Sequence, residues 1–243
     1  MRFLKIAFGC YAFLIFLLSL LVVFPLYFFV FKWSAPRHAP ARAHRISRGW
    51  AQFLFTFFMI RYKVKNKHLI DPRKTYVFVA NHRSMLDIPL FARSCKNTFR
   101  FLSKAELGKI PLLGYVIRNL YITVNRDSKH DRSRSIDAMR KTIKKGISVF
   151  LCPEGTRNTT DKHLLPFKDG AFRLAIATQT PVAIITVFDS DKFLSPYTIA
   201  LRPGTIHAVW SEPVQTKGMG DGDVEKLKEM VIQEMIHQLQ KGS

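Results

Sequence analysis

Two short segments carry the side chains best suited to chemistry, and the first is Asn81–Asp87. It contains a histidine, the side chain whose ordinary pKa suits proton abstraction near neutral pH. A neighbouring carboxylate can fix the tautomer of such a ring and stabilise the imidazolium. His82 and Asp87 can meet if His82 lies in a turn and Asp87 lies in the first turn of a helix. The segment therefore predicts a general base, His82, oriented by Asp87.

A structural interpretation of the same segment stays open. Ser84 is a good N-cap residue, and Asp87 stands where the acidic half of a capping box would stand. In that case Asp87 only caps a helix and His82 is an ordinary loop residue. The chain contains no G-x-S-x-G motif, so a histidine acting directly on an acceptor hydroxyl is a simpler scheme than a serine nucleophile.

The second segment is Pro153–Arg157, which reads P-E-G-T-R. Backbone N–H groups of a glycine-containing turn can hold an anion, and arginine binds phosphate through two parallel hydrogen bonds. Arg126 follows another predicted strand and is a further candidate phosphate ligand. The competing interpretation is an ordinary strand-to-loop turn with an exposed arginine. The thiol of Cys152, just before the turn, is expected to be buried and unreactive.

Both segments follow apolar runs rich in β-branched and aromatic residues, as buried strands do. Strands are predicted over residues 75–80, 120–124, 147–152, 181–187 and 206–210, and helices over 131–145, 170–178 and 224–240. This alternation predicts an α/β fold in which helices flank a mixed, largely parallel sheet. Ligands of open α/β sheets bind beyond the carboxyl ends of strands. We therefore expect the two polar segments to form one site.

The first sixty residues have a different character. Residues 6–31 contain no charged residue, which exceeds the span of about 20 that a bilayer requires and is too long for the apolar core of a cleaved signal peptide. Because Pro25 interrupts it, we expect either one kinked span or, together with a second helix over residues 50–60, a two-helix motif within one leaflet. Residues 36–48 are expected to be a linker. The expected domains are a membrane anchor, 1–60, and a catalytic domain, 61–243.

The charge of the chain indicates an anionic partner. Lysine and arginine number 38 against 17 acidic residues, a net charge of +21. Basic residues after the apolar segment predict a cytoplasmic body and attraction to anionic membrane lipids. Nucleic acid is not expected, because the aromatic residues lie in apolar segments and are not interleaved with basic ones. The three cysteines form no C-x-x-C pair and the histidines no H-x-x-x-H pair, so no metal site is expected.

The two segments together match a known pattern. Asn81, His82 and Asp87 match N-H-x-x-x-x-D, and Pro153–Arg157 match a strand followed by P-E-G-T-R. In this the chain resembles the glycerolipid acyltransferase family, typified by the 1-acyl-sn-glycerol-3-phosphate (lysophosphatidic acid) acyltransferases. The resemblance implies that His82 deprotonates the acceptor hydroxyl as it attacks an acyl thioester. It also implies that the acceptor's glycerol phosphate is bound by five residues: Arg126, Glu154, Gly155, Thr156 and Arg157.

The resemblance further implies that no cofactor is required, with acyl-CoA or acyl carrier protein as donor and phosphatidic acid as product at the cell membrane. Thr123, Cys152 and Ile184 depart from residues common in the family's motifs, and this puts the exact acceptor in doubt. Another lyso-lipid, such as lyso-ornithine lipid, stays open, although it lacks the phosphate that the arginines would hold. A non-enzymatic basic membrane adaptor is the other alternative, but it has no use for a histidine–carboxylate pair beside such a turn.

Overall fold

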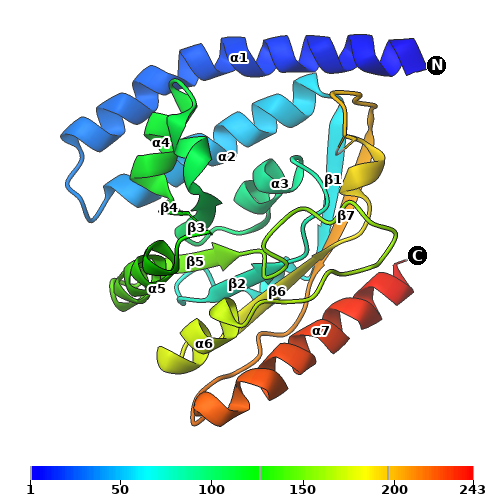
Figure 1. Ribbon diagram of the computed structural model, residues 1–243. Coiled ribbons are helices and arrows are strands. Elements are labelled where there is room, and N and C mark those ends of the chain that lie inside the picture. Colours follow the sequence, from blue (N-terminus) through cyan, green and yellow to red (C-terminus); the bar gives the residue numbers. More distant parts are fainter. Residues whose placement is uncertain (1, 126, 196, 243) are drawn as a thin grey trace.

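One mixed sheet organises the chain (Figure 1). In the computed structural model, which describes residues 2–125, 127–195 and 197–242, seven strands form this sheet. Their order is β1 (Ile60–Lys65), β7 (Gly204–Trp210), β6 (Val182–Val187), β2 (Val77–Ala80), β5 (Ser148–Leu151), β3 (Phe99–Lys104) and β4 (Ile122–Val124). Neighbouring strands are parallel except β6 and β7, which are antiparallel. The predicted mixed, largely parallel sheet is confirmed.

Helices cover both faces of the sheet (Figure 1). The core on one face includes side chains of α2 (Ala39–Phe57) and α3 (Asp87–Ser94), and that on the other includes side chains of α5 (Lys129–Lys144), α6 (Gly170–Ala177) and α7 (Val224–Lys241). The remaining helices are α1 (Arg2–Trp33), α4 (Leu113–Leu120) and the short 3₁₀ turns η1 (Lys67–Leu69), η2 (Ala105–Lys109), η3 (Ser190–Lys192) and η4 (Asp221–Asp223). The strands β2, β3, β4, β5 and β6 run in one direction, so their carboxyl ends meet at one edge.

The central strands explain which predictions from sequence succeeded. Every residue of β2, β5 and β6 is buried, as expected for parallel strands covered on both faces, so their apolar runs are continuous. Strands β1 and β3 were not predicted. Their sequences, IRYKVK and FRFLSK, mix basic and apolar residues, and β1 is an edge strand whose alternate side chains face solvent.

The expected linker over residues 36–48 is wrong, because α2 begins at Ala39. Pro40 occupies the first turn of α2, where its missing N–H breaks no helical hydrogen bond. The expected helix over residues 50–60 is the second half of α2, which ends at Phe57, and Ile60 already belongs to β1. Small buried residues of α2 allow α1 to approach closely, and the hydroxyls of Tyr27 and Ser47 lie 2.8 Å apart across the contact.

Helix α1 lies lengthwise on the body, antiparallel to α2, and bends in the half that contains Pro25 (Figure 1). By length and hydropathy it could cross a membrane. In its most apolar stretch of 18 residues, only 17% of the residues are buried against the rest of the protein. Its outward face is a continuous row of large apolar side chains: Phe3, Leu4, Tyr11, Phe13, Leu14, Leu17, Leu18, Leu21, Val22, Leu26, Phe29 and Trp33. Such a row is far more apolar surface than a water-exposed helix usually carries.

The buried imidazole of His44 makes the fold acid-sensitive. His44 hydrogen-bonds the backbone of Phe99, and burial, with lesser help from Arg48 and Arg100, lowers its pKa to about 4. Between about pH 6.5 and pH 4, His44 is protonated in the unfolded chain but neutral in the folded one. The free energy of unfolding therefore falls as the pH drops from about 6.5 towards 4. We expect a loss of up to about 3 kcal/mol, measured by denaturant unfolding at several pH values.

The matched control is the exposed His130. Replacing His44 by phenylalanine should flatten the pH dependence of the unfolding free energy between pH 4 and pH 6.5, whereas His130→Phe should leave it unchanged. An equal acid sensitivity in His44→Phe and the parent would contradict the assignment.

Candidate active site

His82 and Asp87 form a hydrogen-bonded pair at the carboxyl end of β2. His82 Nδ1 lies 2.8 Å from Asp87 Oδ2, and the two side chains are 15% and 0% exposed. An ionised carboxylate only accepts hydrogen bonds, so Nδ1 carries the proton and donates it. The other ring nitrogen, Nε2, is then left with a lone pair. The structure thus brings together the two residues predicted as base and orienting carboxylate.

Asp87 is held by the chain around it. Its Oδ2 also accepts the backbone N–H groups of Arg83 and Ser84, each at 2.9 Å. Asp87 begins α3, where the helix dipole favours a negative charge. The N-cap residue of α3 is Leu86 and not the expected Ser84. The Ser84 hydroxyl nevertheless accepts the N–H of Leu86, and Asp87 accepts the N–H of Ser84, as expected for the acidic half of a capping box. The first-turn position expected for Asp87 is confirmed.

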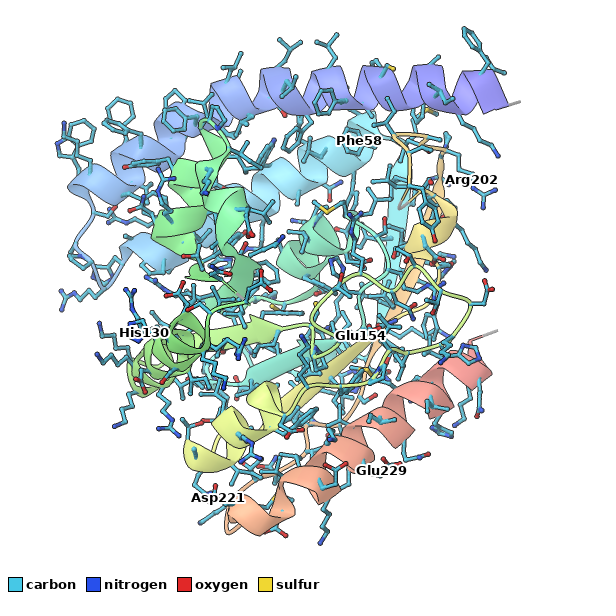
Figure 2. All side chains as sticks on the ribbon, viewed as in Figure 1. Phe58, His130, Glu154, Arg202, Asp221 and Glu229 are labelled. Carbon is cyan, nitrogen blue, oxygen red and sulfur yellow. The ribbon has the colours of Figure 1, made fainter. Side chains whose placement is uncertain are left out.

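Glu154 joins the two polar segments from inside. It is 4% exposed, and Figure 2 shows it in the interior of the fold. One carboxylate oxygen accepts the backbone N–H of His82 at 3.0 Å and the other accepts that of Leu165 at 2.9 Å. Burial raises the pKa of Glu154, although these two donors act in the opposite direction. Its carboxylate therefore sets the position of the His82 loop relative to the turn after β5.

The turn after β5 runs alongside the His82 loop. Gly155 donates its N–H to the carbonyl of Cys152 at 2.9 Å and has a φ of 75°, a backbone conformation that favours glycine. Asn158 donates its backbone N–H to the carbonyl of His82 at 2.7 Å. Arg157 therefore directly precedes a residue that is bonded to the His82 loop. Thr156 is exposed and Arg157 partly exposed. These two side chains can therefore meet a ligand from solvent.

Arg126 lies outside the described residues. The strand before it, β4, ends at Val124 on the same edge of the sheet as β2 and β5, separated from β5 by β3. The phosphate-binding role expected of Arg126 stays a prediction.

Three residues that organise the site were not singled out from sequence for these roles. The Asn81 side chain forms two hydrogen bonds of 2.8 Å with the backbone of Val187, which ties the β2 loop to β6. Arg83 binds Asp191 Oδ2 at 3.0 Å, and the Asn158 amide donates to the carbonyl of Lys162 at 2.8 Å. Their partners are distant in sequence or are backbone atoms, so no local spacing could have identified them.

A second histidine–aspartate pair differs from the first. His207, on β7, donates both its backbone N–H and its ring nitrogen Nδ1 to Asp189, each at 2.8 Å. Its side chain is 46% exposed, whereas that of His82 is 15% exposed. This pair closes the base of the β6–β7 connection. Among the described residues, no three His, Cys, Asp or Glu side chains gather as a metal site requires.

The fold and site define an α/β protein with a hydrogen-bonded histidine–aspartate pair next to a glycine-containing turn that carries an arginine. A sequence model of the family described as Acyltransferase matches residues 61–188, slightly more than half of the chain. The chain therefore belongs to the acyltransferase family, as its motifs predicted.

Similar proteins support this membership. An uncharacterised acyltransferase of Schizosaccharomyces pombe is 30% identical over 175 residues, 71% of this chain and 63% of that relative. Human 1-acyl-sn-glycerol-3-phosphate acyltransferase beta is 28% identical over 183 residues, 74% of this chain and 65% of its own. The chain thus spans slightly less than two thirds of these curated relatives.

A solved structure shows the same fold. The crystal structure of the 1-acyl-sn-glycerophosphate (LPA) acyltransferase PlsC from Thermotoga maritima matches with a TM-score of 0.82 over 98% of both chains, at 23% sequence identity. The match extends over α1 and α2 as well as the sheet, because almost the whole chain is covered.

Proposed function

We propose that this protein transfers a fatty acyl group from an acyl thioester to the free hydroxyl of 1-acyl-sn-glycerol 3-phosphate, which yields phosphatidic acid. The observation that carries the proposal is the His82–Asp87 pair next to the turn that contains Arg157: Nδ1 is bonded to Asp87, and no described residue forms a hydrogen bond with Nε2. The names of the human relative and of the Thermotoga maritima structure support the acceptor.

In the proposed reaction, His82 Nε2 takes the proton of the acceptor hydroxyl as its oxygen attacks the thioester carbonyl. The negative charge of Asp87 stabilises the imidazolium that forms. The tetrahedral intermediate then collapses, the carbon–sulfur bond breaks, and the leaving thiolate takes the proton from Nε2. The new ester and a free thiol leave, and His82 is neutral again. No metal or other cofactor enters this scheme.

The second segment divides into two roles. We assign Arg157 and the exposed Thr156 to the acceptor's phosphate, together with Arg126. Glu154 and Gly155 act on the protein itself: Glu154 fixes the His82 loop and Gly155 forms the turn. A carboxylate bound to two backbone donors is a poor partner for an anionic phosphate, so Glu154 positions the site and does not contact the phosphate.

Arg157→Ala should raise the KM for the phosphorylated acceptor by about 10- to 100-fold, because a charge-assisted hydrogen-bonded contact is worth about 1.5–3 kcal/mol. The KM for the acyl donor should be unchanged. Steady-state kinetics with each substrate varied in turn would measure both. Arg140→Ala, which removes an exposed arginine from α5, is the matched control. An increase confined to the donor KM would contradict the phosphate role.

We also propose that α1 lies in the plane of one leaflet of the cell membrane and that the body is cytoplasmic. The support is the packing of α1 along α2, which leaves its apolar row facing away from the sheet (Figure 2). Lys32, Arg37, Arg42 and Arg45 are exposed where α1 ends and α2 begins. They are suited to anionic headgroups and, by the positive-inside rule, to the cytoplasmic side.

The double variant Leu18→Asp, Val22→Asp should weaken binding to anionic vesicles by about 100-fold or more, because a charge in the bilayer core costs about 2.5–3.5 kcal/mol. Both side chains are exposed on α1, so the fold should persist. Vesicle co-sedimentation would measure binding. The matched control, Ser133→Asp with Gln240→Asp, adds the same charge at exposed sites on α5 and α7 and should bind nearly as the parent does.

The function is tested by acyl transfer on the detergent-solubilised protein, with palmitoyl-CoA, oleoyl-CoA and acyl carrier protein thioesters offered in parallel. Lysophosphatidic acid, lyso-ornithine lipid and monoacylglycerol serve as acceptors. Phosphatidic acid formed from lysophosphatidic acid supports the proposal, and the productive thioester identifies the donor. If only lyso-ornithine lipid gave product, lyso-ornithine lipid would be the acceptor in place of lysophosphatidic acid. If no acceptor gave product, acyl transfer would be refuted.

A further inference from the structure

The connection between β6 and β7 rises to the amino-terminal end of α1. We call residues 190–195 and 197–203 the β6–β7 hairpin; Leu194 and Leu201 form an antiparallel bridge in it. Leu201 donates its N–H to the carbonyl of Lys5 at 3.1 Å. Gly9 packs so closely that a Cβ there would overlap the carbonyl oxygen of Ile199. The hairpin is therefore fixed to α1 by backbone contacts.

This hairpin extends the apolar surface of α1. Tyr197 and Ile199 are 75% and 48% exposed, and they belong to the segment that contacts the end of α1 carrying the exposed Phe3 and Leu4. Basic residues adjoin them: Lys5, Lys192 and Arg202 are exposed, and Arg202 lies near that end of α1 in Figure 2. Exposed aromatic and aliphatic side chains among lysines and arginines are typical of a membrane–water interface.

The same hairpin is hydrogen-bonded to both loops of the site. The Tyr197 hydroxyl donates to the carbonyl of Thr159 at 2.6 Å, on the segment that follows Arg157. Asp191 accepts Arg83, the residue after His82, at 3.0 Å. The same Arg83 guanidinium also donates to the carbonyls of Thr160 and Lys162, which links the two loops to each other.

We propose that the β6–β7 hairpin is a second membrane-contacting element, which places Tyr197 and Ile199 in an anionic phospholipid bilayer beside α1. By its bonds to the two loops, it holds the His82 site at the bilayer surface, so that the lipid acceptor reaches His82 without crossing water. The membrane contact is inferred from the apolar surface that the hairpin shares with α1. The delivery of the acceptor rests on the proposed function.

The membrane contact is tested without acyl transfer. A nitroxide label is attached to the cysteine of Ile199→Cys in a protein that also carries Cys10→Ser. The signal of the labelled Cys10→Ser protein without the cysteine at 199 is subtracted. The collisions of the nitroxide with oxygen and with a water-soluble nickel complex are then measured. Ser133→Cys on α5, on the opposite face of the sheet, is the matched control. Vesicles of phosphatidylcholine and phosphatidylglycerol should raise oxygen collisions and lower nickel collisions at position 199 only. A probe at 199 that stays as nickel-accessible as one at 133 would overturn the contact.

Delivery is tested by comparing acceptors. Ile199→Asp should lower transfer to lysophosphatidic acid in vesicles by about tenfold, because it removes a partly buried apolar contact. Transfer to a monomeric, short-chain lysophosphatidic acid should be unchanged. An equal loss with both acceptors would show that the variant only damages the site and would overturn delivery. If the unaltered protein acylates neither acceptor, the proposed function fails while the nitroxide result still decides the membrane contact.

Discussion

We expect His82→Ala to lower kcat for acyl transfer by about 10²- to 10⁴-fold, the range typical of a removed general base. Among the described residues, His82 is the histidine whose ring is hydrogen-bonded to Asp87. The variant should nevertheless fold. The backbone bonds of residue 82 to Glu154 and Asn158 do not use the side chain, and Asp87 keeps the N–H groups of Arg83 and Ser84.

The control for this result is the other histidine–aspartate pair. His207→Ala removes an imidazole of similar hydrogen bonding from β7 and should cost far less activity. Thermal unfolding and vesicle binding of His82→Ala should match those of the parent. If His82→Ala retained most of the parental kcat, the general-base role would be wrong. A larger loss in His207→Ala would move the base to that residue.

The second large effect is expected at Glu154. Glu154→Gln keeps the size of the side chain but turns one hydrogen-bond acceptor into a donor, which then faces the backbone N–H of His82 or of Leu165. A buried N–H without an acceptor costs about 1–3 kcal/mol. We therefore expect a less stable protein whose His82 loop shifts. Because displacement of a catalytic group by about 1 Å can cost 100-fold, kcat should fall by roughly that factor.

Kinetics separate this positioning role from phosphate binding. If Glu154 acts through the His82 loop, Glu154→Gln lowers kcat while the KM for lysophosphatidic acid changes little, the reverse of Arg157→Ala. Glu154→Asp retains both acceptor oxygens on a shorter side chain and should recover part of the lost kcat. A rise in acceptor KM with an unchanged kcat would instead return Glu154 to the phosphate site expected from the family resemblance.

The sequence by itself determined the central sheet and the location of the site. Strands β2, β5 and β6 are buried on both faces, so their apolar runs are continuous and can be recognised in the sequence. The residues His82, Asp87 and Arg157 stand directly after such strands. Parallel strands place their carboxyl ends at one edge, so segments far apart along the chain were bound to meet there.

Only the tertiary structure decided how these residues are supported. Asn81 pairs with Val187 across 106 positions, and Glu154 points inward to accept the N–H of His82 instead of facing a ligand. The direction of α1 and the place of the β6–β7 hairpin against Gly9 were equally invisible. The physical reason is common to all of them: a side chain's partner depends on which distant segment the fold brings beside it, and local propensity and periodicity carry no information about that.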